Sequence, residues 1–360
     1  MGQVTETTRP LVGRVVGVYG SAGAPWAHLA YAAWHGAEVR VVRAEDVVAG
    51  RLAELDVFVM PGGGATAMAG LLAPLGDGGA SAIRDWVLRG GTYLSSCAGS
   101  VLPLALDGEA AAALPQAAAL RMVDVALANP GDATLGGLAS PGVGRIEVRV
   151  DRSHPVARDV PERVSLIHYN GPLFDLAGAP DTVTPFAWPV AASEAFTPAE
   201  RFLPAGDGAG DGAADGVVDV RADDAATTVF ERCVAAGAAT ALDAKVGAGR
   251  AILFGSHPEF GLGPIGLGWG EGAGLLLGAL RAPDGASTAS RRDASPADPG
   301  WSVRPDRPDR GASELAISVA GQLDSAADRF RAIADRPPGA WLEPERAASF
   351  HGRDARAIWR

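Results

Sequence analysis

The chain has 360 residues, 48% of them hydrophobic, with a formal net charge of −11 and a pI of about 5.0. This composition predicts a globular protein with an ample core and excludes a strongly basic face, so we expect no nucleic-acid partner. Two cysteines, no visible secretory signal and no apolar run of about 20 residues exclude a disulfide framework and indicate a cytoplasmic protein without a membrane partner.

Strand and helix patterns alternate along the first 130 residues. β-branched runs that end in glycine or turn residues predict strands, and apolar residues at helical spacing predict helices. The predicted strands are Arg14–Gly20, Glu38–Arg43, Asp56–Gly64 and Thr92–Ser96, and the predicted helices include Ala24–Gly36 and Ser81–Gly91. This alternation indicates βαβ units and a mostly parallel, buried sheet.

The pattern changes after about Gly142, where turns join a series of predicted strands. Gly-Ala-Gly between two apolar runs predicts a β-hairpin, and Cys233 alternates like a core residue of a strand. The predicted strands are Gly144–Asp151, Arg163–Phe174, Thr227–Gly237 and the hairpin within Thr240–Phe260, followed by a helix over Gly272–Ala282.

Composition also divides the chain into parts. Residues 1–282 are expected to form one domain, interrupted by an acidic, glycine-rich surface insert at about 204–216. Residues 283–312 have the composition of a disordered linker, and residues 313–360 are expected to form a helical extension. Its amphipathic part predicts docking on the domain, on a second copy or on a protein partner.

Cys97 lies where a buried strand meets a predicted helix. The letters SSCAGS place small residues around it, which is typical of a nucleophile elbow, where the backbone is strained and a substrate comes close. The start of the helix would favour the thiolate. The alternative is a small buried hydrophobic residue, which most cysteines are.

A cysteine nucleophile needs a base, and the base needs a group that orients it. Of the six histidines, His257 is the best candidate, because Glu259 follows two residues later in an extended segment and points the same way. The Glu259 carboxylate could then hold one imidazole nitrogen, as in other catalytic triads.

Two further segments could complete a site. Gly62 and Gly63, after the third predicted strand, could bind an oxyanion together with the N–H of Ala98, although an ordinary turn is the alternative. Tyr169 and Asn170 end another strand and could contact the substrate, although packing at the strand end would also explain them. No Gly-x-Gly-x-x-Gly phosphate loop is in place, which argues against a dinucleotide. We expect no cofactor and no metal.

Three motifs follow one another along the chain: a Pro-Gly-Gly loop, a strand with a cysteine elbow, and a distant strand with His-Pro-Glu. From about Arg14 to Leu280 this order resembles the class I glutamine amidotransferase-like superfamily. The resemblance implies an α/β, flavodoxin-like sheet and a triad of Cys97, His257 and Glu259. GGTYLSSCAGS, HYNGPLF and VGAGRAILFGSHPEF are most similar to the N-terminal-like domain of biotin-protein ligases.

The sequence departs from the amidotransferase pattern at two places. Ser95 stands where the pattern has glycine, and Ser100-Val101 follow Gly99 without the expected glutamine. We therefore expect a cysteine-dependent amidase or amidotransferase-like hydrolase acting on a small amide or related acyl compound. A non-catalytic binding or regulatory module is the alternative, and a serine hydrolase using Ser96 or Ser100 is a third hypothesis.

Overall fold

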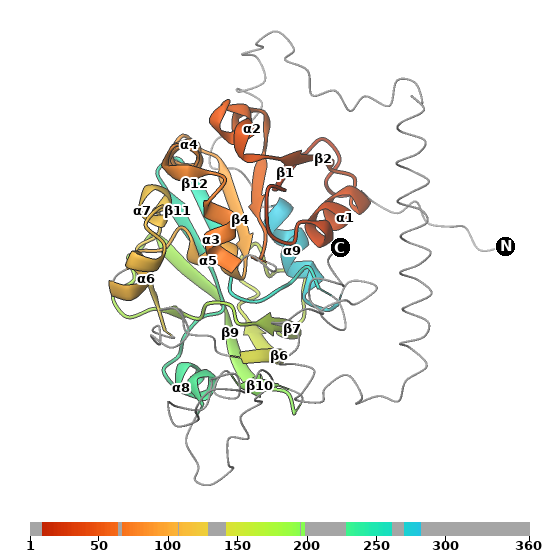
Figure 1. The fold of residues 1–360 in the computed structure, drawn as a ribbon. Coiled ribbons are helices and arrows are strands. Elements are labelled where there is room, and N and C mark those ends of the chain that lie inside the picture. Colours follow the sequence, from red (N-terminus) through yellow and green to blue (C-terminus); the bar gives the residue numbers. More distant parts are fainter. Residues whose placement is uncertain are drawn as a thin grey trace, which may run out of the picture.

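A ten-stranded mixed sheet runs through the molecule (Figure 1). The computed structural model describes residues 9–63, 67–106, 108–128, 142–194, 196–198, 228–260 and 270–281. The strands of the sheet are β1 (Val15–Tyr19), β2 (Glu38–Val42), β3 (Val57–Met60), β4 (Thr92–Ser96), β6 (Gly142–Val150), β7 (Arg163–Tyr169), β9 (Val183–Ala192), β10 (Thr197–Pro198), β11 (Ala241–Val246) and β12 (Gly249–Phe254). Strands β5 (Ala126–Leu127) and β8 (Phe174–Asp175) form a separate two-stranded sheet.

Five strands of this sheet are parallel and lie in the order β2-β1-β3-β4-β12. This is the strand order of flavodoxin-like folds, and it confirms the predicted α/β class. In such a sheet all five strands end at one edge, so the residues that follow β3, β4 and β12 meet there. The three predicted site motifs follow these three neighbouring strands.

The other half of the sheet is antiparallel. The predicted hairpin is confirmed: β12 pairs with β11, and β11 pairs with β9. Strand β9 then pairs with β6, which also pairs with β7 and β10. The sequence did not indicate β9, because Pro185 and Pro189 cannot donate hydrogen bonds within a sheet. The structure accommodates both prolines beside irregularities in the register of β9 with β11 and with β6.

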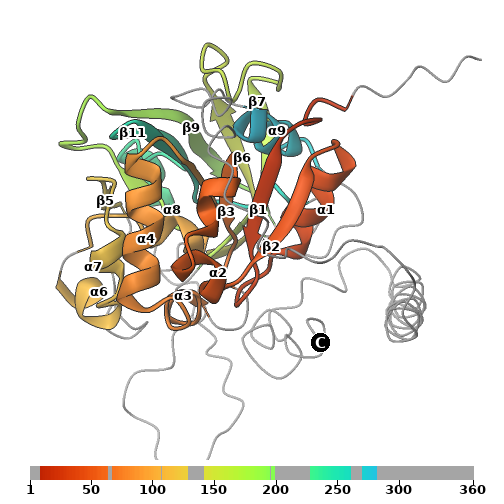
Figure 2. The ribbon, with the colours of Figure 1, turned by 90° about the horizontal axis from the view of Figure 1, so that it is seen from above.

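Helices cover both faces of the sheet and make a three-layer molecule (Figures 1 and 2). Side chains of successive strand residues enter opposite cores, so Phe58 packs on one face and Val57 and Val59 on the other. The helices on the Phe58 face are α2 (Ala44–Val48), α3 (Ala67–Leu72), α4 (Gly76–Leu88) and α7 (Ala117–Leu120). Those on the other face are α1 (Trp26–Trp34), α8 (Val229–Ala235) and α9 (Ala273–Arg281).

The remaining helical segments are short. They are the 3-10 helix η1 (Arg51–Glu54), α5 (Ala98–Val101) and α6 (Gly108–Ala113). Helix α5 begins immediately after Cys97 and α1 ends before Gly36, whose φ of +93° fits the predicted helix end. The predicted helices Ala24–Gly36, Ser81–Gly91 and Gly272–Ala282 correspond to α1, the second part of α4, and α9.

The strand predicted over Thr227–Gly237 is wrong, because this segment forms helix α8. Thr228 accepts a hydrogen bond from the backbone N–H of Glu231, whose side chain accepts one from the N–H of Thr228. This capping box starts a helix, and Gly237 at φ +74° ends it. Cys233 is buried as expected, but it lies on a helix face and not on a strand.

Several predictions concern segments outside the described residues. These are the acidic insert at 204–216, the linker at 283–312 and the helical extension at 313–360. Within the described segments, every helix is too short or too polar to cross a lipid bilayer.

Candidate active site

Cys97 occupies a strained turn between β4 and α5. Its φ of +50° and ψ of −121° are unusual for a residue with a side chain, and the strain is typical of a nucleophile elbow. The backbone N–H of Cys97 donates a 2.8 Å hydrogen bond to the carbonyl oxygen of Phe254, the last residue of β12. The elbow is therefore tied to the strand that precedes His257. Cys97 is 8% exposed.

Glycines allow other segments to come close to this elbow. A Cβ atom on Gly99 would lie 2.5 Å from the carbonyl oxygen of Met60, so the start of α5 packs directly on the end of β3. A Cβ atom on Gly171 would lie 1.7 Å from the carbonyl oxygen of Gly255 and 3.5 Å from the Cα atom of Cys97. These two glycines of the sequence motifs are therefore explained by close backbone contacts around the cysteine.

His257 and Glu259 follow β12 at the same edge of the sheet. The N–H of His257 donates to the carbonyl oxygen of Ile167 at 2.8 Å, which joins this segment to β7. Nδ1 of His257 lies 2.7 Å from Oε1 of Glu259, a hydrogen bond between two buried side chains. The ring of Phe260 stacks on the imidazole with centroids 4.5 Å apart. The imidazole is thus held both at its edge and on one face.

The charges of this pair reinforce each other. Burial alone would lower the pKa of His257, but the charges of Glu259 and Cys97 and the hydrogen bond to Glu259 raise it to about 10. Burial alone would raise the pKa of Glu259, but His28 and His257 lower it to about 2. At neutral pH the pair is therefore an imidazolium next to a carboxylate.

The structure brings Cys97 and His257 to one place. The thiol Sγ donates a 3.3 Å hydrogen bond to the carbonyl oxygen of Tyr169. An electrostatic interaction with Cys97 contributes to the raised pKa of His257. Gly62 lies against both residues: a Cβ atom there would be 2.9 Å from Cε1 of His257 and 3.4 Å from Cβ of Cys97. The three residues predicted as a triad and one residue predicted for the oxyanion therefore form a single cluster.

The residues predicted to bind an oxyanion line this cluster by their backbone. Among the described residues, no acceptor takes a hydrogen bond from the N–H of Gly62 or of Ala98. Ala98 is the first residue of α5, and Gly62 and Gly63 are buried after β3. Two backbone donors thus lie beside Cys97 and are available to an added oxygen atom.

The chain at Tyr169 and Asn170 passes close to the cysteine. The carbonyl oxygen of Tyr169 faces the thiol of Cys97. Burial, with a smaller contribution from Cys97, raises the pKa of the Tyr169 phenol to about 12, so this group is neutral. Asn170 has a φ of +49°, and its N–H donates to the carbonyl oxygen of Gly142. This turn directs the chain from β7 past the cysteine.

Three serines near the elbow have hydroxyl partners. Oγ of Ser95 lies 2.9 Å from Oγ of Ser100, which donates to the carbonyl oxygen of Phe254 at 2.8 Å. Ser96 donates to Oε1 of Glu259 at 2.9 Å. Ser96 and Ser100 are fully buried, which argues against a serine nucleophile at either position.

For two residues of the cluster, the sequence did not predict a contact with Glu259. Besides Ser96, the buried His28 of α1 lies 3.7 Å from Oε2 of Glu259 through its Nε2 atom. An inward-facing histidine on an amphipathic helix gives no local signal that distinguishes it from a core residue. Only the helical spacing of α1 could have indicated that His28 faces the sheet.

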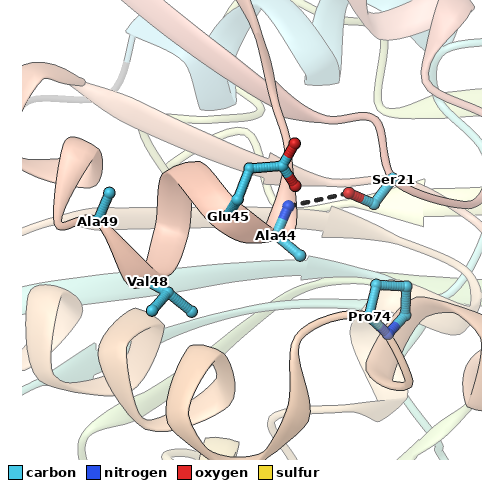
Figure 3. Close-up of a pocket in the computed structure, with 6 residues that line it drawn as sticks. All are labelled: Ser21, Ala44, Glu45, Val48, Ala49 and Pro74. Atoms are coloured by element: carbon cyan, nitrogen blue, oxygen red, sulfur yellow. Dashed lines mark hydrogen bonds between the residues drawn. The ribbon is translucent and has the colours of Figure 1, made fainter. Parts of the chain in front are cut away.

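A separate shallow pocket of about 490 Å³ lies near the ends of β1 and β2 (Figure 3). Its polar contact is a 2.9 Å hydrogen bond from the N–H of Ala44 to the hydroxyl of Ser21. The residues that line it are Ser21, Ala44, Glu45, Val48, Ala49 and Pro74. None of the predicted site residues is among them. In the described part of the chain, His, Cys, Asp and Glu residues form no group of three suited to a metal ion.

Comparisons with known proteins give structural likenesses only. No protein-family model matches the chain, and no curated protein matches its sequence. PurLQS from Thermotoga maritima has a TM-score of 0.42 at 13% identity, over 74% of this chain and 97% of that one. A cytoplasmic protein from Salmonella typhimurium has a TM-score of 0.42 at 13% identity, over 74% and 98%. A glutamine amidotransferase from Thermotoga maritima has a TM-score of 0.34 at 13% identity, over 70% and 77%.

Proposed function

We propose that the protein is a cysteine-dependent amidase or amidotransferase-like hydrolase. The observation that carries this proposal is the buried hydrogen bond between His257 and Glu259 beside the strained Cys97. Backbone strain costs stability, and a buried ion pair often stabilises a fold less than apolar packing of the same volume would. Both features are typical of sites where the arrangement serves chemistry. The sequence motifs for a class I glutamine amidotransferase-like triad fall on the same three residues.

In this proposal Cys97 is the nucleophile. Because Nδ1 of His257 is engaged by Glu259, Nε2 is the nitrogen that exchanges a proton with the thiol. The imidazolium stabilises the thiolate, which attacks the acyl carbon of an amide. The carbonyl π electrons move to its oxygen, and the N–H groups of Ala98 and of Gly62 or Gly63 donate to this oxyanion.

The second half of the reaction releases the two products. His257 donates its proton to the amide nitrogen, the C–N bond breaks, and an amine or ammonia leaves with a thioester on Cys97. The neutral imidazole then takes a proton from water, whose oxygen attacks the thioester. The C–S bond breaks, the acid is released and the thiol is restored. Glu259 stays ionised throughout and keeps the imidazole oriented, as its low pKa requires.

The departures from the amidotransferase pattern do not disturb the elbow. Ser95 replaces a glycine, but its hydroxyl pairs with Ser100 and does not point at the thiol. Val101 stands near the place of the expected glutamine and is buried. We propose a small amide or related acyl compound as the substrate. The similarity to the biotin-protein ligase N-terminal-like domain depends on sequence motifs and adds no substrate class. A cytoplasmic location and a partner bound through residues 313–360 complete the proposal.

The test is turnover of a panel of small amides, including glutamine, measured as release of ammonia or amine. Hydrolysis that disappears in Cys97→Ala and falls at least about 100-fold in His257→Ala would support the proposal, since general acid–base catalysis contributes 10²–10⁴-fold. Hydrolysis that survives in Cys97→Ala would overturn it. Ser100→Ala serves as the matched control, because it removes a nearby buried hydroxyl but leaves the thiol in place.

A non-catalytic binding module is the second candidate. The observation that favours it is the low exposure of Cys97 and His257, 8% and 5%. Such a module would keep its ligand or partner affinity in Cys97→Ser and show no turnover of any amide. Binding that depends on residues 313–360 and is unaffected at the cysteine would identify this function.

A further inference from the structure

His28 belongs to the same buried cluster as the proposed triad, although it lies far from the other members in the sequence. It is on α1, its side chain faces the sheet, and it is 2% exposed. Its Nε2 atom lies 3.4 Å from Oγ of Ser96 and 3.7 Å from Oε2 of Glu259. Elements from the first and last parts of the domain therefore meet behind the His257–Glu259 pair.

The two carboxylate oxygens of Glu259 have different surroundings. Oε1 accepts hydrogen bonds from Nδ1 of His257 and from the hydroxyl of Ser96. Oε2 is buried and accepts no hydrogen bond within the described part of the chain. Nε2 of His28 lies 3.7 Å from this oxygen. Rotation of the carboxylate about its Cγ–Cδ bond is therefore limited on one side by His257 and Ser96 and on the other by His28.

Core packing does not explain a histidine at this position. Nδ1 of His28 is buried without a hydrogen-bond partner among the described atoms, an arrangement that costs stability. Burial lowers the pKa of His28, and His257 lowers it further, while Glu259 opposes both effects. The ring is therefore neutral at neutral pH, and the positive charge by which His28 lowers the pKa of Glu259 is present only in acid. With its proton on Nε2, the ring can donate toward Ser96 and Glu259. Nδ1 then carries no proton and can act only as an acceptor.

We propose that His28 is a positioning residue of the site, which fixes the Glu259 carboxylate from behind and so keeps the imidazole of His257 aimed at Cys97. The inference depends on the proposed function, because orientation of His257 matters for reactivity only if His257 acts on Cys97. His28 itself does not touch the thiol in this role. Ser96 links His28 to Glu259, since its hydroxyl donates to Glu259 and can accept from His28.

The test uses the alkylation rate of Cys97 by iodoacetamide in the full chain, followed by peptide mass spectrometry from about pH 5 to about pH 10. His28→Met and His28→Gln are nearly isosteric, but only glutamine keeps a donor near the position of Nε2. We expect His28→Met to lower the rate about tenfold and to change the shape of the pH profile. We expect His28→Gln to stay within about twofold of the wild type, because its amide restores the donor.

A second buried histidine provides the control for general loss of packing. His154 is 8% exposed, contacts Asp243 through Nε2 at 3.3 Å and stacks on Phe186. His154→Met should lower the unfolding temperature but leave the alkylation rate and its pH profile unchanged. If His28→Met does not fold, His28→Asn replaces it, since the shorter amide cannot reach Ser96 or Glu259.

The outcomes separate the inference from the proposed function. If His257→Ala slows alkylation but His28→Met matches the wild type in rate and pH profile, the role of His28 is overturned and the triad stands. An equal loss of rate in His28→Met and His28→Gln also overturns it, because the donor would then be irrelevant. If His257→Ala has no effect either, the proposed function fails and the role of His28 fails with it.

Discussion

Glu259 accepts a 2.7 Å hydrogen bond from Nδ1 of His257, and Pro258 is the residue between them. Both side chains are buried, so each charge depends on the other for its stabilisation. The pKa of His257 is raised to about 10 and that of Glu259 is lowered to about 2. The unfolding free energy should therefore depend on pH through the titration of this pair.

The first prediction concerns this pH dependence. The stabilisation from His257 is complete below its ordinary pKa of 6.5 and is lost as the pH rises toward 10, because the native state then binds more protons than the unfolded state. The stabilisation from Glu259 is complete above 4.5 and is lost as the pH falls toward 2. The pair thus contributes most between these two ordinary values.

Urea unfolding at a series of pH values measures this effect. In Glu259→Gln the main cause of the raised pKa of His257 is gone, so the wild type should lose more stability than the variant between about pH 6.5 and about pH 10. Buried tyrosines with raised pKa values affect both proteins equally and cancel in the difference. Parallel stability curves for the two proteins would contradict the assignment of charges.

The second prediction concerns the pair of Ser95 and Ser100. Ser100→Ala removes the partner of the Ser95 hydroxyl and one donor to the carbonyl of Phe254, and should cost about 1–3 kcal/mol of unfolding free energy. The two hydroxyls share one hydrogen bond, which either single variant already removes. The loss of unfolding free energy in the double variant should therefore be smaller than the sum of the losses in Ser95→Ala and Ser100→Ala. Additive effects, or labelling of Ser100 by a serine-directed phosphonate, would contradict a structural role.

Part of this site was predictable because its residues lie at strand ends. Cys97 and His257 each follow a recognisable β-run, and parallel neighbouring strands end at one edge, so their meeting follows from strand order. His28 could not be predicted in the same way. Its role depends on which helix face packs against the sheet, and this is decided by tertiary contacts of α1 with β1 and β2.

The two wrong predictions of secondary structure have local physical causes. Val229, Phe230, Cys233 and Val234 look like a β-run in composition, but the capping box of Thr228 and Glu231 and the glycine at 237 determine a helix. Strand β9 carries Pro185 and Pro189 and was not expected in the interior of the sheet. Register irregularities beside these prolines, which no sequence pattern marks, make the strand possible.

The third prediction concerns the contact of Gly62 with the pair. In Gly62→Ala the added Cβ would lie 2.9 Å from Cε1 of His257, so the imidazole must shift by a few tenths of an ångström. We expect slower alkylation of Cys97, by about five- to tenfold, because proton transfer depends on this geometry.

The matched control is Gly78→Ala in helix α4, where an added Cβ meets no atom within 4 Å. This variant should gain about 0.5–1 kcal/mol of stability, since alanine favours a helix over glycine, and should keep the wild-type alkylation rate. Equal alkylation rates for Gly62→Ala and Gly78→Ala would show that Gly62 does not constrain the imidazole.

The fourth prediction concerns the strain at Cys97. Glycine adopts a φ of +50° without the steric cost that a Cβ atom imposes, so Cys97→Gly should be more stable than Cys97→Ala by about 1 kcal/mol. Midpoints of urea unfolding for the two variants measure the difference. A less stable glycine variant would mean that the turn carries no strain, and the case for a nucleophile elbow would weaken.

The alkylation rate of Cys97 in the wild type and in His257→Ala tests the central claim most directly. The peptide that contains Cys233 is an internal reference, because burial raises the pKa of this second thiol to about 11. We predict that iodoacetamide labels Cys97 of the native protein at neutral pH and that His257→Ala slows this labelling at least about tenfold, with Cys233 unlabelled in both. Equal rates at Cys97 in the two proteins would contradict a thiol activated by His257.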